Sequence, residues 1–573
     1  MHKHLIRILF TGLVMLSMIP LFSQEVYFQR LFTSLDRQTI NYGCEPTEDG
    51  GFYLLNFFSD DTEMRFGLNI SKHDKKGNLV WTNDYELETA IYGVDFRRVD
   101  MVNTGRDTLV VSGLRFPDEN GSDGNYMLKI EPGTGETVYS GLITNRSGVS
   151  GPAFWPKLIN GFHEELNYLG SHIAFDSTFR LHLEKINQNN DSISSKSFTA
   201  IDEDGFPVLT ALLDATNSMD SSSLVVSCIS SPDELLESVG LLTIDSSSNI
   251  TSAHKYSIDS IMYQGMQVFG MDATRDTGIV MTGSYVDVVT NNTTGFVFKT
   301  DSLGQVVWSK NIGSLTPFSI SIPNSCLYTS GDEILVMGKS ADLFTGELSD
   351  FAIFLDDEGN VLRQKLYSSE NSFFLDLSVG LVLLAGELQN SPDGSILYST
   401  TGIDLENGLV LSPLGIKMDQ EGAAVCEDTL NVELLTDISI IRDTLFMVED
   451  NVVVRDTTTV EIVPFNDYDL PILTLLDTFF CPQDPVMATL NATLENATSY
   501  LWSTGDTTPT LFVTEEGEYQ VTVTLDDRIC YMLCDTSNIS VRDFPEANIS
   551  PDLSVPCQVT LAATSTTDIA LAV

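Results

Sequence analysis

Short apolar runs recur along the chain at a nearly constant spacing. Each run ends in glycine or a substitute residue at positions 56, 113, 170, 228, 283, 338 and 400, so the intervals are 57, 57, 58, 55, 55 and 62 residues. Runs of this length that are rich in Val, Ile, Leu and Phe predict β-strands. No unit contains the apolar spacing of an amphipathic helix. The pattern therefore predicts an all-β protein with seven repeated units.

A second landmark follows each run at a similar distance. In four units an Asp and a Gly lie three positions apart, at Asp74/Gly77, Asp301/Gly304, Asp356/Gly359 and Asp419/Gly422. Asp at the first position of a tight turn accepts a backbone hydrogen bond, and Gly tolerates the fourth position. The phrase SKHDKKGNLVW (71–81), repeated as KTDSLGQVVW (299–308), is therefore interpreted as a structural hairpin rather than a catalytic motif.

Seven units of about 57 residues cannot bury their apolar faces singly, but a radial arrangement buries them all. This predicts a seven-bladed β-propeller over residues 25–425. A row of immunoglobulin-like sandwiches would need about 100 residues per module. The seventh unit lacks a good last strand, and the segment 26–32 has the right pattern to supply it. We expect that segment to close the ring and so remove exposed sheet edges.

The first 24 residues have the layout of a removable secretory signal. A short positive head precedes an apolar run from Ile8 to Phe22, and a polar chain follows. A retained membrane anchor is the alternative, although the run is short for a spanning helix. We expect a protein that is secreted or held on the outer cell surface, without membrane insertion after signal removal.

Charge and cysteine content further limit the class of protein that this sequence can be. Eighty acidic residues against thirty basic ones give a net charge of −50, which repels nucleic acid.

Four cysteines are far apart and are interpreted as buried strand residues: Cys44, Cys228, Cys326 and Cys426. Four others crowd the C-terminal end, and export permits disulfides there. Four cysteines allow three pairings, and we expect Cys481 to pair with Cys530 or Cys534.

Two stretches resemble known families. The pattern GGFYLLN…KHDKKGNLVW resembles the degenerate propeller repeats of secreted bacterial proteins and is similar to quinoprotein-type repeats. The stretch YLWSTGDTTPTLFVTEEGEYQVTVT (500–524) resembles the immunoglobulin- or PKD-like modules of Bacteroidota proteins that use type IX secretion. Such proteins often end in a gliding-motility-associated C-terminal sorting domain. The resemblance implies a multidomain surface protein, and the sorting domain is not present in this sequence.

The resemblance and the strand patterns together divide the rest of the chain. Residues 426–478 are predicted to be a small β-sandwich or an interdomain β-segment, and residues 479–543 an Ig/PKD-like β-sandwich with Trp502 in its core. Residues 544–573 are interpreted as the start of a further, truncated β module.

Catalytic motifs are missing from the sequence. There is no His-Glu-x-x-His, no Gly-x-Ser-x-Gly, and the P-loop-like VMGKS (336–340) has Glu333 where glycine is required. The stretch PDENGSDGN (117–125) resembles a calcium loop, but Asp123 replaces the required glycine and Lys129 the bidentate glutamate. No catalytic residue, metal ligand or cofactor is predicted; Ca²⁺ is left open without a specific motif.

The long connectors between units hold aromatic residues beside a rare basic pair. Most of these rings are expected to pack between blades. If they form a ligand platform, the candidate residues are Arg97, Arg98, Trp155 and Tyr263.

These observations favour a non-enzymatic extracellular or cell-surface binding or adhesion protein, whose partner is an extracellular glycan or protein. Two other classes stay open. One is a secreted propeller enzyme that acts on glycans as a glycosidase or lyase, or a quinoprotein-like dehydrogenase. The other is a purely structural spacer.

Overall fold

The computed structural model describes most of the chain between residues 27 and 565. Its described residues are 27–32, 38–60, 65–86, 99–104, 108–115, 124–144, 154–161, 165–173, 179–190, 192–202, 204–205, 207–231, 238–259, 263–288, 292–313, 319–342, 347–373, 386–404, 410–424, 427–429, 435–450, 454–456, 475, 478–480, 486–494, 497–525, 532–541, 547–552 and 560–565. The predicted signal (1–24) lies outside them. No helix capable of crossing a membrane occurs among the described residues.

The chain forms two units, Met1–Leu470 with Arg528–Tyr531, and Pro471–Asp527 with Met532–Val573. Every element in the described residues is a β-strand, so the all-β prediction is confirmed. We describe each unit separately.

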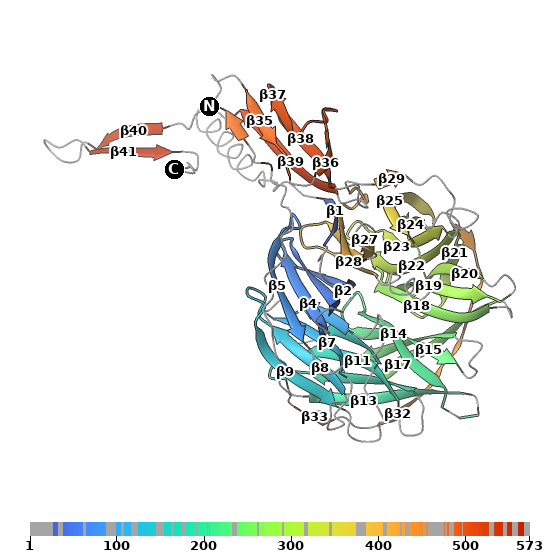
Figure 1. Cartoon of the computed structure of the whole chain (residues 1–573). Coiled ribbons are helices and arrows are strands. Elements are labelled where there is room, and N and C mark those ends of the chain that lie inside the picture. Colours follow the sequence, from blue (N-terminus) through green and yellow to red (C-terminus); the bar gives the residue numbers. More distant parts are fainter. Residues whose placement is uncertain are drawn as a thin grey trace, which may run out of the picture. The chain divides into compact units, whose positions relative to one another are not determined.

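The described residues of the first unit form seven antiparallel sheets (Figure 1). Each sheet contains strands that are consecutive in the sequence. They are β2 (Gln38–Pro46), β3 (Phe52–Asp60), β4 (Arg65–His73), β5 (Leu79–Glu86); β6 (Val99–Asn103), β7 (Leu109–Arg115), β8 (Gly124–Ile130), β9 (Thr137–Thr144); β10 (Phe154–Asn160), β11 (Leu166–Ile173), β12 (Phe179–Ile186), β13 (Ser192–Ile201); β14 (Leu209–Asn217), β15 (Ser223–Ser231), β16 (Ser238–Asp245), β17 (Ile250–Ile258); β18 (Tyr263–Ala273), β19 (Ile279–Asp287), β20 (Asn292–Thr300), β21 (Val306–Ile312); β22 (Ser319–Tyr328), β23 (Ile334–Asp342), β24 (Glu347–Leu355), β25 (Val361–Phe373); and β26 (Gly386–Asn390), β27 (Ile396–Asp404), β28 (Val410–Met418).

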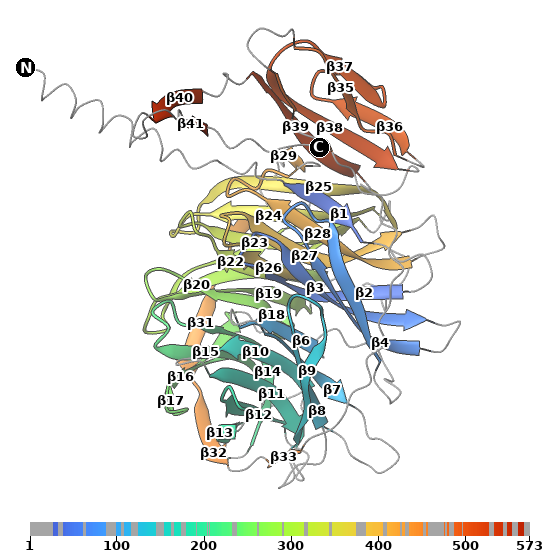
Figure 2. The same ribbon diagram turned by 90° about the vertical axis from the view of Figure 1, so that its left-hand side faces the viewer.

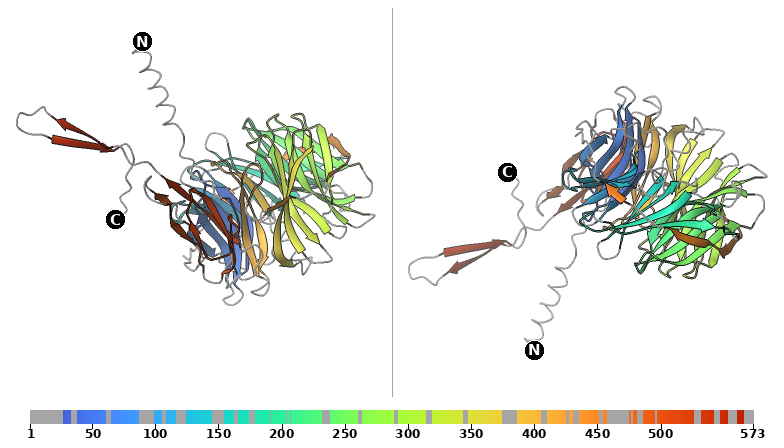
Figure 3. Two further views of the ribbon diagram at one scale, coloured as in Figure 1. Left: turned by 90° about the horizontal axis from the view of Figure 1, so that it is seen from above. Right: turned by 90° about the horizontal axis from the view of Figure 1, so that it is seen from below.

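The first strands of the sheets meet at the centre of this unit. β2 contacts β6, and the series continues through β10, β14, β18, β22 and β26, which in turn contacts β2. The contacts therefore close into a ring, and this is the arrangement of a β-propeller. The sheets of this unit are seen from two further sides in Figure 3.

The N-terminal strand β1 (Phe28–Leu31) completes the last sheet. It pairs antiparallel with β28, so that Phe28 lies opposite Lys417 and Leu31 opposite Leu414. Phe28 and Phe32 pack with Phe52 in one buried cluster. The two ends of the repeat are thereby joined by strand pairing and by apolar contact.

Apolar side chains fill the seams between neighbouring sheets. One cluster joins Val239 and Tyr256 of the sheet β14–β17 to Met281 and Phe296 of the sheet β18–β21. Similar clusters lie between other adjacent sheets. Strands in the middle of the sheets, such as β12, β16 and β19, are therefore buried over most of their length, whereas the outer strand β17 is only partly buried.

The Asp-x-x-Gly hairpins are confirmed as structural turns. The amide of Gly304 donates to the carbonyl of Asp301 (2.9 Å), and Gly304 has a φ of +74°. The Asp301 carboxylate also accepts the amides of Leu303 and Gln305. The turns at Asp74, Asp356 and Asp419 repeat these bonds.

Three of these turns also receive an aromatic side chain from the preceding sheet. The hydroxyl of buried Tyr256 donates to the carbonyl of Gly304 (2.8 Å), and that of Tyr367 donates to Gly422 (2.8 Å). The indole of Trp308 donates to the carbonyl of Asp357 (2.8 Å) and lies against Gly359. The repeated Asp, Gly and Trp positions thus join one sheet to the next.

Five short strands follow the last sheet. They pair with the sheets of the unit in the reverse of their sequence order. We call them the belt: β29 (Glu427–Thr429), β30 (Leu435–Asp437), β31 (Ile440–Thr444), β32 (Phe446–Asp450) and β33 (Val454–Asp456). These strands pair with the outer strands β25, β21, β17, β13 and β9 in that order. Figure 2 shows β31 and β32, in orange, at the outer edges of their sheets.

The belt lies within residues 426–478, for which the sequence predicts a small β-sandwich or an interdomain β-segment; its described strands pair with sheets of the first unit and not with one another. Its strands have three to five residues each, too short to make a separate core, and they add a fifth strand to five existing sheets. Three buried side chains fix it, one per seam: Leu435, Ile440 and Leu445.

The second unit has a four-stranded sheet of β34 (Thr478–Phe480), β39 (Met532–Val541), β38 (Gly517–Leu525) and β36 (Ala497–Trp502). Two strand pairs accompany it, β35 (Ala488–Asn491) with β37 (Thr510–Val513), and β40 (Ala547–Asp552) with β41 (Thr560–Ser565). Trp502 is 1% exposed, and its indole donates to the carbonyl of Thr508 (2.7 Å).

The cysteines divide as follows. Cys44, Cys228 and Cys326 are buried and free, which confirms their interpretation as strand residues. Cys426, Cys481 and Cys530 lie outside the described residues, and only the backbone of Cys534 is described. The pairing of Cys481 stays a prediction.

We predict that Leu445→Ala lowers the free energy of unfolding by about 2–4 kcal/mol, because it empties a buried seam position. The matched control is Ile441→Ala on the same strand run, where the side chain is 46% exposed. Urea unfolding of both variants measures the difference. Equal, small effects would contradict a stabilising role of the belt.

We also predict that Gly359→Ala is more destabilising than Gly394→Ala. Both glycines have left-handed backbones, with φ of +79° and +88°, so alanine costs about 1–2 kcal/mol at either site. A Cβ at Gly359 would lie 2.6 Å from Trp308, whereas Gly394 has open space. Thermal unfolding of the two variants isolates the Trp308 contact, and equal midpoints would show that this contact contributes nothing.

Candidate functional site

One residue from the first strand of each sheet lies at the centre of the first unit. In each sheet a turn joins the first strand to the second, and one residue donates its amide across that turn, for example Thr104, Gly161 or Ser218. The central residue lies four positions before this donor. We call this set the inner ring: Gly43, Asp100, Lys157, Asp214, Gly270, Ser325 and Glu387. All of these except Gly43 line a cavity of about 580 Å³.

Inner-ring side chains bind the backbone of the following sheet. Asp100 accepts the amide of Leu158, and Asp214 accepts that of Met271 (3.0 Å). Ser325 accepts the amide of Leu388 (3.2 Å). Glu387 accepts the amide of Cys44 (3.0 Å), across the point where the ring closes. These bonds fix the carboxylates in direction and position.

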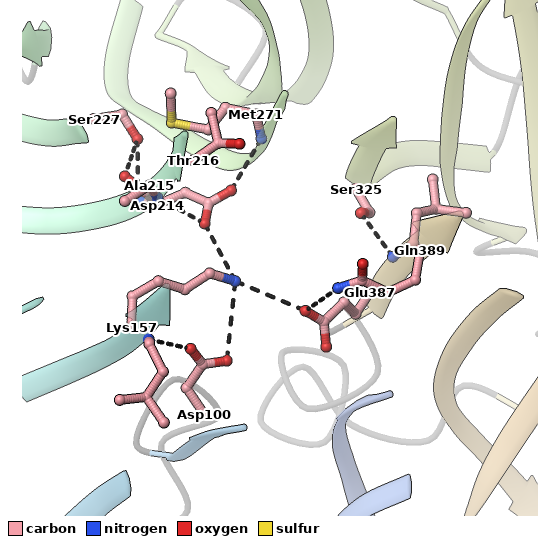
Figure 4. A network of polar contacts seen from close by, with 12 residues as sticks. Asp100, Lys157, Asp214, Ala215, Thr216, Ser227, Met271, Ser325, Glu387 and Gln389 are labelled. Carbon is pink, nitrogen blue, oxygen red and sulfur yellow. Dashed lines mark hydrogen bonds and ion pairs between the residues drawn. The ribbon is translucent and has the colours of Figure 1, made fainter. Parts of the chain in front are cut away.

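Lys157 breaks this pattern because an ammonium group cannot accept a hydrogen bond. Its Nζ instead lies 3.9 Å from Asp100, 3.5 Å from Asp214 and 3.7 Å from Glu387 (Figure 4). Asp100 and Asp214 come from the two neighbouring sheets, whereas Glu387 comes from the last sheet of the repeat. One ammonium thus links four of the seven sheets.

Gly43 makes room for Glu387. A Cβ at residue 43 would collide with the Glu387 carboxylate oxygen Oε2. Any larger residue at this position would therefore displace the carboxylate from Cys44.

Burial alters the ionisation of these groups. Burial raises the pKa of Glu387 to about 7, opposed by Lys157 and increased by Asp100 and Asp214. Burial likewise raises the pKa of Asp100, and Lys157 opposes the rise. Burial alone would lower the pKa of Lys157, but the surrounding carboxylates raise it well above its usual range. Lys157 is therefore a permanent cation.

Two further carboxyl groups face the same cavity, Glu45 and Asp272. Burial, together with Glu387, raises the pKa of Glu45 well above its usual range, and burial raises that of Asp272 to about 6. Asp272 accepts the amide of Tyr328 (2.8 Å). The cavity therefore contains five carboxyl groups and one ammonium, so acidic groups are in excess.

A second pocket of about 400 Å³ shares Asn217 and Asp272 with the cavity. It is formed by the hairpin turns that follow the first strands, and it contains the exposed ion pair Arg275–Asp332. Exposed pairs of this kind contribute little stability. The shared residues indicate that this pocket adjoins the acidic cavity.

The residues selected from sequence have different locations. Arg97 and Arg98 lie outside the described residues, as does most of the calcium-like loop (117–123). Trp155 lies in a bulge of β10, and its side chain is not described. Tyr263 is 7% exposed and packs edge-to-face on Tyr285, with ring centroids 6.3 Å apart. Tyr263 therefore lies in the core that joins two sheets.

Sequence reasoning missed the inner ring, although its members are close to the residues it selected. Asp100 follows Arg98 by two positions, and Lys157 follows Trp155 by two. A signal was present, because Asp100, Lys157 and Asp214 are separated by the repeat length of 57. Charged residues at a constant phase of an otherwise apolar repeat indicate a shared location.

Comparison with known proteins gives only distant structural likeness. No family model matches the chain, and no curated protein matches it. A protein of unknown function from Dyadobacter fermentans is 12% identical, with a TM-score of 0.35 over 68% of this chain and 96% of that one. The Dos1 propeller is 11% identical, with a TM-score of 0.38 over 69% and 95%. A mannose phosphorylase from Leishmania mexicana is 9% identical, with a TM-score of 0.26 over 71% and 94%.

Scores this low carry no argument about function. The propeller architecture rests instead on the sheet order and on the closed series of first-strand contacts.

The raised pKa of Glu387 predicts that stability falls as pH rises from about 4.5 to about 7. In that interval the folded protein keeps a proton on Glu387 that the unfolded chain releases, so the folded state is favoured at the acidic end. Thermal unfolding midpoints across this range measure the effect. Glu387→Gln should reduce the slope, and the other carboxyl groups with raised pKa values, Glu45, Asp100 and Asp272, leave a residual slope. An unchanged slope in Glu387→Gln would contradict the assignment.

Proposed function

We propose that this chain is a non-enzymatic extracellular or cell-surface binding protein. In this proposal its first unit is a seven-bladed β-propeller, its second an immunoglobulin- or PKD-like module, and its export follows the Bacteroidota type IX route. The ligand is an extracellular protein that places a lysine or arginine side chain in the central cavity.

The excess of acidic groups in that cavity carries the proposal. Asp100, Asp214 and Glu387 surround Lys157, and Glu45 and Asp272 add two more carboxyl groups. A cation that enters would stabilise their ionised forms and release protons from the groups whose pKa is raised. The volume of about 580 Å³ lies within the usual range of ligand pockets.

The hydrogen bonds of the cavity favour binding over chemistry. Each inner-ring carboxylate accepts a backbone amide of the next sheet, so it is held as a fixed acceptor. Fixed carboxylates recognise a cation through charge and geometry without any movement of the protein. The net charge of −50 also attracts cationic partners over longer distances.

A glycosidase is the second candidate, and one observation favours it. Glu387 has a pKa of about 7, suited to a general acid, beside the carboxylates of Asp100 and Asp214. Lys157 contacts all three, which places them around a single point. A glycan that loses a sugar on incubation with the chain, but not with Glu387→Gln, would support this activity.

The binding proposal is tested by calorimetry of the full chain with a lysine-rich peptide and with its lysine-acetylated form at about 0.15 M salt. We predict that only the unmodified peptide binds, and that Asp214→Asn weakens binding about tenfold or more. Asp437→Asn is the matched control, because Asp437 is an 87% exposed belt residue outside the cavity.

Two results would contradict this proposal. Equal weakening by both variants would show that the peptide binds the general negative surface. Equal binding of the acetylated peptide would show that charge in the cavity plays no part.

A further inference from the structure

A row of polar side chains is buried within the sheet of β10–β13. The strand register places Tyr168 opposite Glu184, and Glu184 opposite Ser195, so the three share one face of the sheet. Tyr168 packs in the cluster that contains Val102 and Met127 of the preceding sheet. The row therefore lies in the seam between these two sheets, on different strands from the inner ring.

The polar atoms of this row lack hydrogen-bond partners within the described part of the chain. Glu184 and Tyr168 are both 0% exposed. Neither carboxylate oxygen of Glu184, nor the hydroxyls of Tyr168 and Ser195, has a partner. Burial, together with the Glu184 charge, raises the pKa of Tyr168 well above its usual range, so its hydroxyl stays protonated.

Among the described residues, His182 forms an ion-pair contact with Glu184. Its Nε2 lies 3.8 Å from Glu184 Oε2, which is beyond hydrogen-bond distance, and its Nδ1 lies 3.4 Å from Ser197. This contact leaves both oxygens of the buried Glu184 carboxylate without a hydrogen bond, and a buried carboxylate that lacks hydrogen-bonded partners is strongly unfavourable.

We propose that a monovalent cation of the size of Na⁺ or K⁺ binds in this seam. Both oxygens of Glu184 and the hydroxyl oxygens of Tyr168 and Ser195 supply its ligands. Oxygen atoms are the ligands that hard cations prefer, and a single carboxylate balances a single positive charge. A divalent ion fits less well, because no group of three acidic, histidine or cysteine side chains suited to a metal occurs among the described residues.

The site has a structural consequence. A cation there joins the row of β11, β12 and β13 beside the apolar cluster that contains Val102 and Met127. Its binding energy adds to the stability of the folded chain by mass action, so the melting temperature depends on cation identity and not only on ionic strength.

The test uses thermal unfolding of the full chain at a fixed pH of about 8.5, well above the ordinary pKa of a carboxyl group. NaCl and KCl are compared with N-methyl-D-glucamine chloride, whose cation is too large to enter, at the same ionic strength. We expect a midpoint higher by about 2 °C or more in at least one alkali salt. Replacement of the organic cation by Na⁺ or K⁺ should give a curve that saturates.

Glu184→Gln should abolish the difference between salts, because the amide removes the charge while it keeps the size. Glu421→Gln is the control at a 77% exposed glutamate and should keep the difference. Equal midpoints of the wild-type chain in all three salts would overturn the proposal and indicate ordered water or a protonated carboxyl. The wild-type titration decides the question even if Glu184→Gln fails to fold.

Discussion

Closure of the ring is the constraint on which the first unit depends. Each sheet has two apolar faces, and neither can be buried unless a neighbouring sheet covers it on each side. A linear row of such sheets would leave two faces exposed. Contact between β26 and β2, together with the pairing of β1 with β28, joins the two ends. The burial of apolar side chains between all neighbouring sheets therefore depends on this closing seam, which joins residues far apart in the sequence.

Two kinds of polar contact set the geometry of this ring. At the outer side, an aromatic side chain of one sheet binds the turn of the next, as Trp308 does at Asp357. At the centre, a carboxylate or hydroxyl of one sheet accepts a backbone amide of the next, as Asp214 does from Met271. These contacts fix the spacing between neighbouring sheets both near the centre of the ring and at its outer side. The belt adds a third connection at the rim of five sheets.

Lys157 shows how a structural position becomes a site. Its neighbours in the ring are acceptors for backbone amides, so a lysine there is left with the carboxylates themselves. Glu387 extends over Gly43 into the same space and completes the cluster. The result is a partly exposed group of charges inside a cavity, where the local dielectric strengthens their interaction with a ligand. The proposed binding role rests on these departures from the repeat, since the regular positions accept backbone amides of the next sheet.

The sequence by itself determined the elements that depend on local physics. The period of about 57 residues, the strands and the Asp-x-x-Gly turns can be predicted because strand propensity and turn chemistry act between residues close in the chain. The sequence also contained the constant spacing of Asp100, Lys157 and Asp214. Only the tertiary structure decided that these side chains meet Glu387, because that contact requires the ring to close. The belt could not be predicted either. Its strands of three to five residues carry too little pattern, and their partners lie up to 314 positions earlier in the chain, as Leu142 lies before Asp456.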